Sequence, residues 1–91
     1  MFSIVYASER ILKHLNDELH IPRDQALKIK TKIENELSNF NPKQRSKDVK
    51  KLQGSSRWRL RTGDYRVIFI PDFKSHAIQI VGISQRSSAY D

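Results

Sequence analysis

The sequence predicts an α+β domain: an N-terminal strand, a two-helix hairpin, a mainly antiparallel sheet and a short C-terminal tail. Apolar residues recur at helical spacing through residues 8–40, and residues 58–83 contain one strictly alternating stretch and two further strand-like runs between turn signals. The 91 residues form a single domain, residues 1–91, because two independent cores would not fit. The helices need an apolar sheet face to cover, so we expect them on one face, with the opposite face open.

The first half of the chain predicts one strand and two helices. Residues 2–7 are rich in β-forming residues and predict the first strand. Ser8 is a suitable N-cap for a first helix that runs to about residue 19. Pro22 suits the first turn of a second helix, which Asn41-Pro42 ends. This second helix carries an apolar stripe made of Ala26, Ile29, Ile33, Leu37 and Phe40.

The second half predicts a meander of three strands. Residues 58–61 alternate strictly, and Gly63-Asp64 is typical of a two-residue hairpin turn. That turn places Thr62 opposite Tyr65 and Arg61 opposite Arg66. Residues 65–70 form the next strand, residues 71–75 a second turn, and residues 77–83 the last strand. Residues 41–56 are expected to be the least structured stretch.

The positive charge is concentrated in one segment. Between Lys43 and Arg66, nine lysines and arginines face two aspartates, so these 24 residues carry the whole net charge of +7. A localised block of this kind indicates a polyanionic partner, usually nucleic acid, or an acidic protein. The alternative is a solvated surface that keeps a small protein soluble.

Alternation along the strands gathers the arginines on one face. Arg57, Arg59 and Arg61 project together, and the predicted register adds Arg66. The opposite face carries the core residues Trp58, Leu60, Tyr65, Val67 and Phe69. Guanidinium groups bind phosphate in a bidentate manner, so the arginine face predicts an anion site. Alternatively, each arginine lies over apolar strand residues or pairs with a carboxylate from elsewhere in the chain.

Several classes of function are disfavoured. The chain has no cysteine, which excludes disulfides and thiolate metal sites. Apolar runs reach about four residues, far below the roughly 20 of a membrane span, and no secretion signal is evident, so we expect a cytoplasmic protein. His14, His20 and His76 show no metal-ligand spacing, and none is an obvious general base. No metal and no cofactor are expected.

Several motifs together resemble the RelE/ParE toxin family. They are Lys51-Leu52-Gln53-Gly54, the run from Trp58 to Phe69 with Gly63-Asp64-Tyr65-Arg66 inside it, Val81-Gly82, and Gln85-Arg86 with Tyr90 four residues after the arginine. The match covers nearly the whole chain and includes the order of helices and strands. The resemblance implies a RelE-like fold and a toxin of a type II toxin–antitoxin system, with a cognate antitoxin as its partner.

The resemblance also implies an activity. RelE-like members cut messenger RNA in the ribosomal A site without a metal: the ribose 2′-OH attacks phosphorus and leaves a 2′,3′-cyclic phosphate and a 5′-OH. ParE-like members share the fold and inhibit DNA gyrase without being enzymes. We expect an RNA endonuclease, with gyrase inhibition as the alternative; a plain nucleic-acid-binding module also stays open.

Carried over position by position, the resemblance implies a set of site residues. The family's site positions fall on Arg57, Arg59, Arg66, Arg86 and Tyr90, and of these the expected catalytic residues are Arg59, Arg66, Arg86 and Tyr90. Together with the basic segment, it gives the RNA-binding residues Lys50, Lys51, Arg57 and Arg61. Tyr90 stacks on a base, contacts the 2′-OH or only packs the tail. Gln85 stands where many members have histidine, and it cannot transfer a proton, so charge stabilisation is retained while the proton-transfer groups are not identified.

Overall fold

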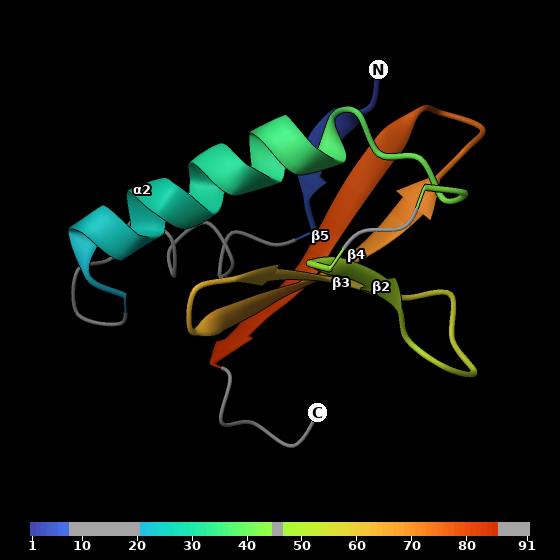
Figure 1. Ribbon diagram of the computed structural model, residues 1–91. Helices are drawn as coiled ribbons and strands as arrows, with labels where there is room; N and C mark the ends of the chain where they lie inside the picture. The colour runs from blue at the N-terminus through green and yellow to red at the C-terminus, as the bar shows by residue number, and fades with distance from the viewer. Residues whose placement is uncertain (8–20, 45–46, 86–91) are drawn as a thin grey trace.

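A computed structural model describes residues 1–7, 21–44 and 47–85, which form a five-stranded sheet with a helix on one face (Figure 1). The strand order is β1 (Ser3–Tyr6), β5 (Ala77–Gln85), β4 (Tyr65–Asp72), β3 (Trp58–Thr62) and β2 (Val49–Lys51). β1 runs parallel to β5, and the other neighbours are antiparallel. The sheet is therefore mixed and mainly antiparallel, as predicted.

Helix α2 (Arg23–Lys32) continues into a π-helical turn, η1 (Ile33–Leu37). Pro22 stands at the N-cap and Asp24 in the first turn, where a negative charge is favourable. The predicted stripe is confirmed: Ala26, Ile29, Ile33, Leu37 and Phe40 are all buried. The π turn was not predicted, because the apolar spacing of the stripe does not distinguish it from a regular turn.

The predicted two-helix hairpin is not established. Its first helix falls on residues 8–19, which lie outside the described part of the chain. Within that part, α2 and η1 form one continuous helical segment. The described helices also include none with the length and apolar character that a membrane crossing requires.

The core lies between this helical segment and the sheet. Leu60, Val67 and Phe69 of β3 and β4 are fully buried, together with Ile78 and Ile80 of β5. An aromatic cluster closes one end: the Phe40 ring lies 4.9 Å from that of Trp58 and 5.5 Å from that of Phe69, both edge to face. These rings fix the end of the helix against the middle of the sheet. The predicted core assignment is confirmed, with Trp58 only partly buried.

The register of the β3–β4 hairpin is confirmed. Thr62 lies opposite Tyr65 and Arg61 opposite Arg66, and Gly63 has a φ of +58°, which glycine adopts without strain. The turn that was predicted to begin at residue 71 begins later, because β4 continues to Asp72. The pairing between β3 and β4 ends at Phe69, so beyond that residue β4 pairs only with β5. Pro71 is tolerated there because the edge of β4 toward β3 is unpaired.

Strand β2 was missed by the sequence analysis, which expected residues 41–56 to be the least structured. The strand is only three residues long and carries two lysines, so it gives no periodic signal. It forms because it pairs with β3, with Val49 opposite Leu60 and Lys50 opposite Arg59.

Candidate nucleic-acid interface

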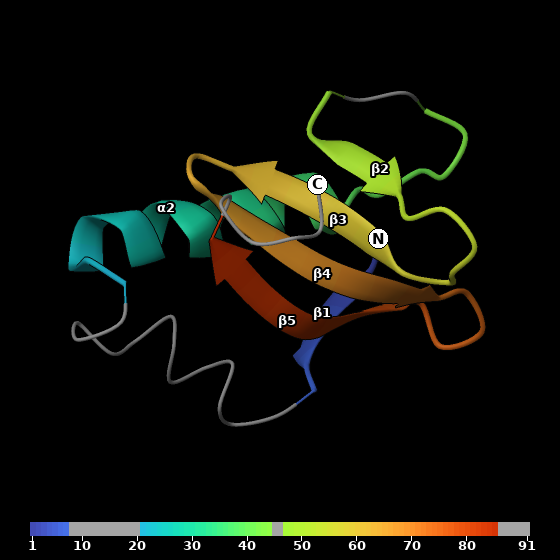
Figure 2. The same ribbon diagram turned by 90° about the horizontal axis from the view of Figure 1, so that it is seen from below.

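Two pairs of cations lie directly opposed on the face of the sheet away from α2, which we call the open face and which Figure 2 views with the helix behind it. Lys50 of β2 faces Arg59 of β3, and Arg61 of β3 faces Arg66 of β4. Directly opposed like charges destabilise a sheet. The arrangement is favourable when an anion lies between or above them, which fits the phosphates of a nucleic acid.

Arg66 is the one buried cation among these four. It lies on the open face by register, opposite Arg61 and Ser84, but it is only 4% exposed. Alternation along a strand determines the face of a side chain and not its depth. The predicted face of Arg66 is therefore confirmed, and its side chain is also part of the packed structure.

The guanidinium of Arg59 is attached to a network that crosses the sheet edge. Arg59 Nη1 donates to the Asp48 backbone oxygen at 3.3 Å, and that same oxygen accepts from the Arg61 backbone nitrogen at 2.7 Å. From the helix, Lys32 Nζ lies 2.8 Å from Asp48 Oδ2 and donates to the Arg61 backbone oxygen at 2.8 Å. Lys32 and Asp48 thus link α2 to the start of β2 and position a cation of the open face.

The remaining predicted site residues divide into three groups. Arg57 precedes β3 and is exposed, and Arg61 is half-buried on the open face. Lys51 lies opposite Trp58, so the register places it on the helix side of the sheet edge and not with the other cations. Arg86 and Tyr90 lie outside the described residues, as do His14 and His20. His76 is exposed in the turn just before β5, with its ring 5.6 Å from that of Phe2.

A depression of about 210 Å³ opens beside the cation pairs. Its walls come from the β2–β3 loop, from β4 and from the second half of β5. The lining residues are Leu52, Arg57, Ile68, Val81, Gly82, Ile83 and Ser84. The open face thus combines cations with a partly apolar hollow, which suits a ligand that carries both phosphate and an apolar ring.

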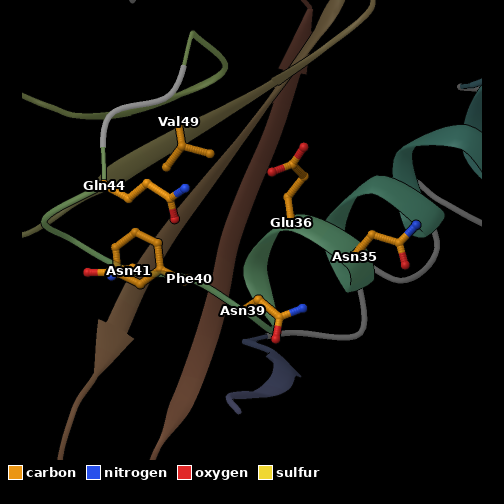
Figure 3. A pocket seen from close by; sticks show the side chains of 7 residues that line it. All are labelled: Asn35, Glu36, Asn39, Phe40, Asn41, Gln44 and Val49. Atoms are coloured by element: carbon orange, nitrogen blue, oxygen red, sulfur yellow. The ribbon is translucent and has the colours of Figure 1, made fainter.

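A second depression, of about 160 Å³, lies between the end of the helical segment and the start of β2 (Figure 3). It is lined by Asn35, Glu36, Asn39, Phe40, Asn41, Gln44 and Val49. Glu36 is its one charged lining residue, and Figure 3 shows this carboxylate facing the space between the helix and Gln44. A carboxylate repels phosphate, so this pocket does not match the chemistry of the open face.

Shifted pKa values occur away from the cation pairs. Burial, and then the nearby charge of Glu34, raise the pKa of Tyr6, whose buried hydroxyl has no hydrogen-bond partner within the described structure. Hydrogen bonds from the Ser75 side chain and from the Ser75 and Lys74 backbone lower the pKa of Asp72. Tyr6 faces the helix side and Asp72 lies at the β4–β5 hairpin. In the described ranges, no three acidic or histidine side chains gather as metal ligands would.

Three residues of this region were missed by the sequence analysis: Lys32, Asp48 and Gly82. Lys32 and Asp48 are 16 positions apart, and their pairing is visible only when the helix is folded onto the sheet. Gly82 was noted only as part of the family motif. Its place on the open face depends on a register shift in β5 that the sequence pattern does not reveal.

The chain is similar to known proteins of one family. The family model described as "ParE toxin of type II toxin-antitoxin system, parDE" matches residues 7–90. A protein of Methanocaldococcus jannaschii that carries the name "Putative toxin RelE1" is 36% identical over 83 residues, which cover 90% of this chain and 88% of that protein.

Solved structures with the same fold include two archaeal toxin–antitoxin complexes. The RelE–RelB complex of Pyrococcus horikoshii OT3 matches with a TM-score of 0.61 and 26% identity over 97% of this chain and 98% of the other. The RelB–RelE complex of Methanococcus jannaschii matches with a TM-score of 0.55 and 27% identity over 96% and 95%. The chain therefore belongs to the RelE/ParE family of toxins of type II toxin–antitoxin systems.

Proposed function

We propose that this toxin is a ribosome-dependent RNA endonuclease that cuts messenger RNA without a metal. The observation that carries the proposal is the double cation pair of the open face, Lys50 with Arg59 and Arg61 with Arg66. A phosphate group of the RNA backbone neutralises such a cluster, and during cleavage it develops further negative charge at the same place. Directly opposed like charges destabilise a sheet, so two such pairs favour a ligand that carries negative charge.

The reaction needs one bond to form and one to break. The 2′-oxygen bonds to the adjacent phosphorus, the bond from phosphorus to the 5′-oxygen breaks, and the products are a 2′,3′-cyclic phosphate and a 5′-OH. The 2′-OH loses a proton to a base, and the leaving 5′-oxygen gains one. Between these events the oxygens on the phosphorus carry extra negative charge. We assign the stabilisation of this charge to Arg59 and Arg66, with Arg86 as the third cation.

The arginines supply charge and positioning, not proton transfer. A guanidinium cation has no free lone pair with which to accept a proton, so none of them acts as a base. The Asp48 carbonyl restrains Arg59 before substrate arrives, which favours a preorganised site. Arg57, Arg61 and Lys50 hold the RNA backbone in this proposal, and Tyr90 stacks on a base or contacts the 2′-OH.

The test is translation in vitro with the purified protein, followed by mapping of messenger RNA ends. Wild type should produce cuts that require ribosomes. Arg59→Ala should lower the cleavage rate by about 100-fold, the scale of losing one preorganised donor, while Arg59→Lys should recover part of it. Lys30→Ala, which removes one exposed charge from α2, should leave the rate unchanged. Equal rates for Arg59→Ala and wild type would contradict the proposal.

The alternative function is inhibition of DNA gyrase without catalysis. Gln85, where many family members carry histidine, favours it because the amide transfers no proton. Trapped gyrase–DNA complexes, together with no messenger RNA cuts in the presence of ribosomes, would establish this alternative over the endonuclease.

We also propose that a cognate antitoxin binds this chain. The P. horikoshii and M. jannaschii structures are toxin–antitoxin complexes of family members. The net charge of +7 favours an acidic or amphipathic antitoxin segment that docks at or near the open face. Affinity should then weaken as salt rises, and an affinity independent of salt would argue against electrostatic docking.

A further inference from the structure

Gly82 creates the hollow on the open face through a change of register. Phe69 of β4 lies opposite Ile80 of β5, yet the next residue, Ile68, lies opposite Gly82, so Val81 is an extra residue in β5. The bulge moves Gly82 onto the open face, in one row with Ile68, Arg59 and Lys50. A cation-rich row therefore ends at a residue with no side chain.

Neither the local backbone nor packing requires glycine at this position. A Cβ atom built on Gly82 would meet nothing within 4 Å, and its φ lies outside the left-handed region. Gly54 and Gly63, by contrast, have φ values of +73° and +58° and serve turns. The effect of Gly82 is to leave space above the backbone of β5, where a flat group can approach closely.

The β2–β3 loop supplies an apolar wall and a cation to the same hollow. The Leu52 backbone nitrogen donates to the Arg57 backbone oxygen at 2.9 Å, which extends the hairpin by one pair on the open side. Ser55 fixes the loop further, because its side-chain oxygen accepts from the Arg57 backbone nitrogen at 3.0 Å. Leu52 and Arg57 are thereby held next to Ile68 and Gly82.

We propose that the hollow at Gly82 is a nucleobase subsite, in which the ring of one RNA base lies over Gly82 against Ile68 and Leu52. This inference rests on the proposed function and names where the substrate's base binds. The hollow offers apolar side chains, a stretch of open backbone and the Ser84 hydroxyl at its edge, which together suit a flat heteroaromatic ring. Arg57 is placed for the phosphate attached to that nucleotide.

Charge distinguishes this hollow from the pocket of Figure 3. That pocket is lined by carboxamides and the Glu36 carboxylate, which disfavours a ligand bearing phosphate. The hollow at Gly82 instead adjoins the row of Ile68, Arg59 and Lys50, so that a base and its phosphates find matching groups within one patch.

Titration of the full-length protein with AMP and with ribose 5-phosphate, followed by amide NMR, tests the subsite. AMP should shift the amide signals of Ile68, Gly82 and Ser84, and ribose 5-phosphate should shift them far less. Gly82→Leu fills the hollow and should weaken AMP binding about tenfold, the scale of losing one base contact, with ribose 5-phosphate binding unchanged. Gln79→Leu, an exposed open-face position of β5 outside the hollow, is the matched control and should bind AMP like wild type.

Two results would overturn the subsite: equal shifts by AMP and ribose 5-phosphate, or unchanged AMP affinity in Gly82→Leu. If Gly82→Leu does not fold, Gly82→Ala serves in its place, since its methyl group has open space, and it should show a smaller loss in the same direction. Base-dependent binding at Gly82 without messenger RNA cleavage would support the subsite while rejecting the proposed endonuclease. Cleavage without base-dependent binding would reject the subsite alone.

Discussion

The two faces of the sheet are built from the same strands and differ in almost every physical respect. Leu60, Val67 and Phe69 point toward the helix and are fully buried, whereas Arg59, Arg61 and Ile68, which alternate with them, remain partly accessible. One face contributes to stability through burial of apolar surface. The other concentrates like charges and a hollow, which oppose folding and favour a ligand.

This difference teaches that stability and binding are separable in this domain, residue by residue. Neighbours along a strand belong to different faces, so a pair of adjacent substitutions reports on both. Arg66 is the exception, because it belongs to the open face by register and to the packed structure by burial.

The largest expected effect is the difference in lost stability between variants of Phe69 and of its neighbour Ile68. Phe69→Ala should lower the free energy of unfolding by about 3–5 kcal/mol, because it empties a fully buried site among Phe40 and Trp58. Ile68→Ala, next to it on the open face and half-buried, should cost less than about 2 kcal/mol. Urea denaturation of both variants measures the contrast. Equal losses would show that side chains on the open face contribute as much to stability as those on the helix side.

The second effect is a difference in stability between variants of two opposed arginines, Arg66 and Arg61. Arg66→Ala should destabilise the fold by about 1–3 kcal/mol, since it removes a buried side chain and its interactions. Arg61→Ala, directly across the sheet and half-buried, should change stability by less than about 0.5 kcal/mol. Both should weaken RNA binding. If Arg66→Ala is as stable as wild type, Arg66 does not contribute to the stability of the fold and acts only through its charge in RNA binding.

The outcome for Arg66 illustrates what the sequence predicts well. The register of β3 and β4 was predictable because two signals agree: the strict alternation of residues 58–61 and the glycine turn at Gly63. A slip by one residue would have moved the arginines into the core. Face is therefore encoded locally, but the depth at which Arg66 lies depends on its surroundings in the folded chain and was not predictable.

The features that were missed depend on contacts distant in sequence. Strand β2 exists only because Val49 and Lys50 find partners on β3, and the Lys32–Asp48 link requires the helix in place. Simple alternation in β5 would put Gly82 with Ile78 and Ile80 in the core; the bulge at Val81 reverses this. The family resemblance includes the motif around Gly82, whereas the hollow that Gly82 lines is visible only in the structure.

The third effect concerns the link between the two faces. Lys32→Met should destabilise the fold by about 1 kcal/mol, because it removes a partly exposed ion pair with Asp48 and a hydrogen bond to the Arg61 carbonyl. Lys30→Met, an exposed lysine of the same helix, is the matched control and should be near neutral. The gap between the two variants should narrow at high salt, since screening weakens the ion pair. A gap that does not change with salt would assign the effect to the hydrogen bond alone.

The smallest expected effect is a pH dependence that the open face should not share. Asp72 Oδ1 accepts hydrogen bonds from the Lys74 and Ser75 backbone nitrogens at 3.0 and 3.3 Å, and the Ser75 side chain contributes most to lowering the pKa of Asp72. The folded-state pKa thus lies below the unfolded value of about 3.9, so the stabilisation is present above that pH and is lost as pH falls through the folded pKa. Asp72→Asn should reduce the loss of stability below about pH 4, whereas Arg61→Ala should keep it, because that change leaves the Asp72 carboxylate and its hydrogen bonds in place. Urea midpoints from about pH 2 to 6 measure the slope, and an unchanged slope in Asp72→Asn would assign the acid sensitivity to other carboxylates.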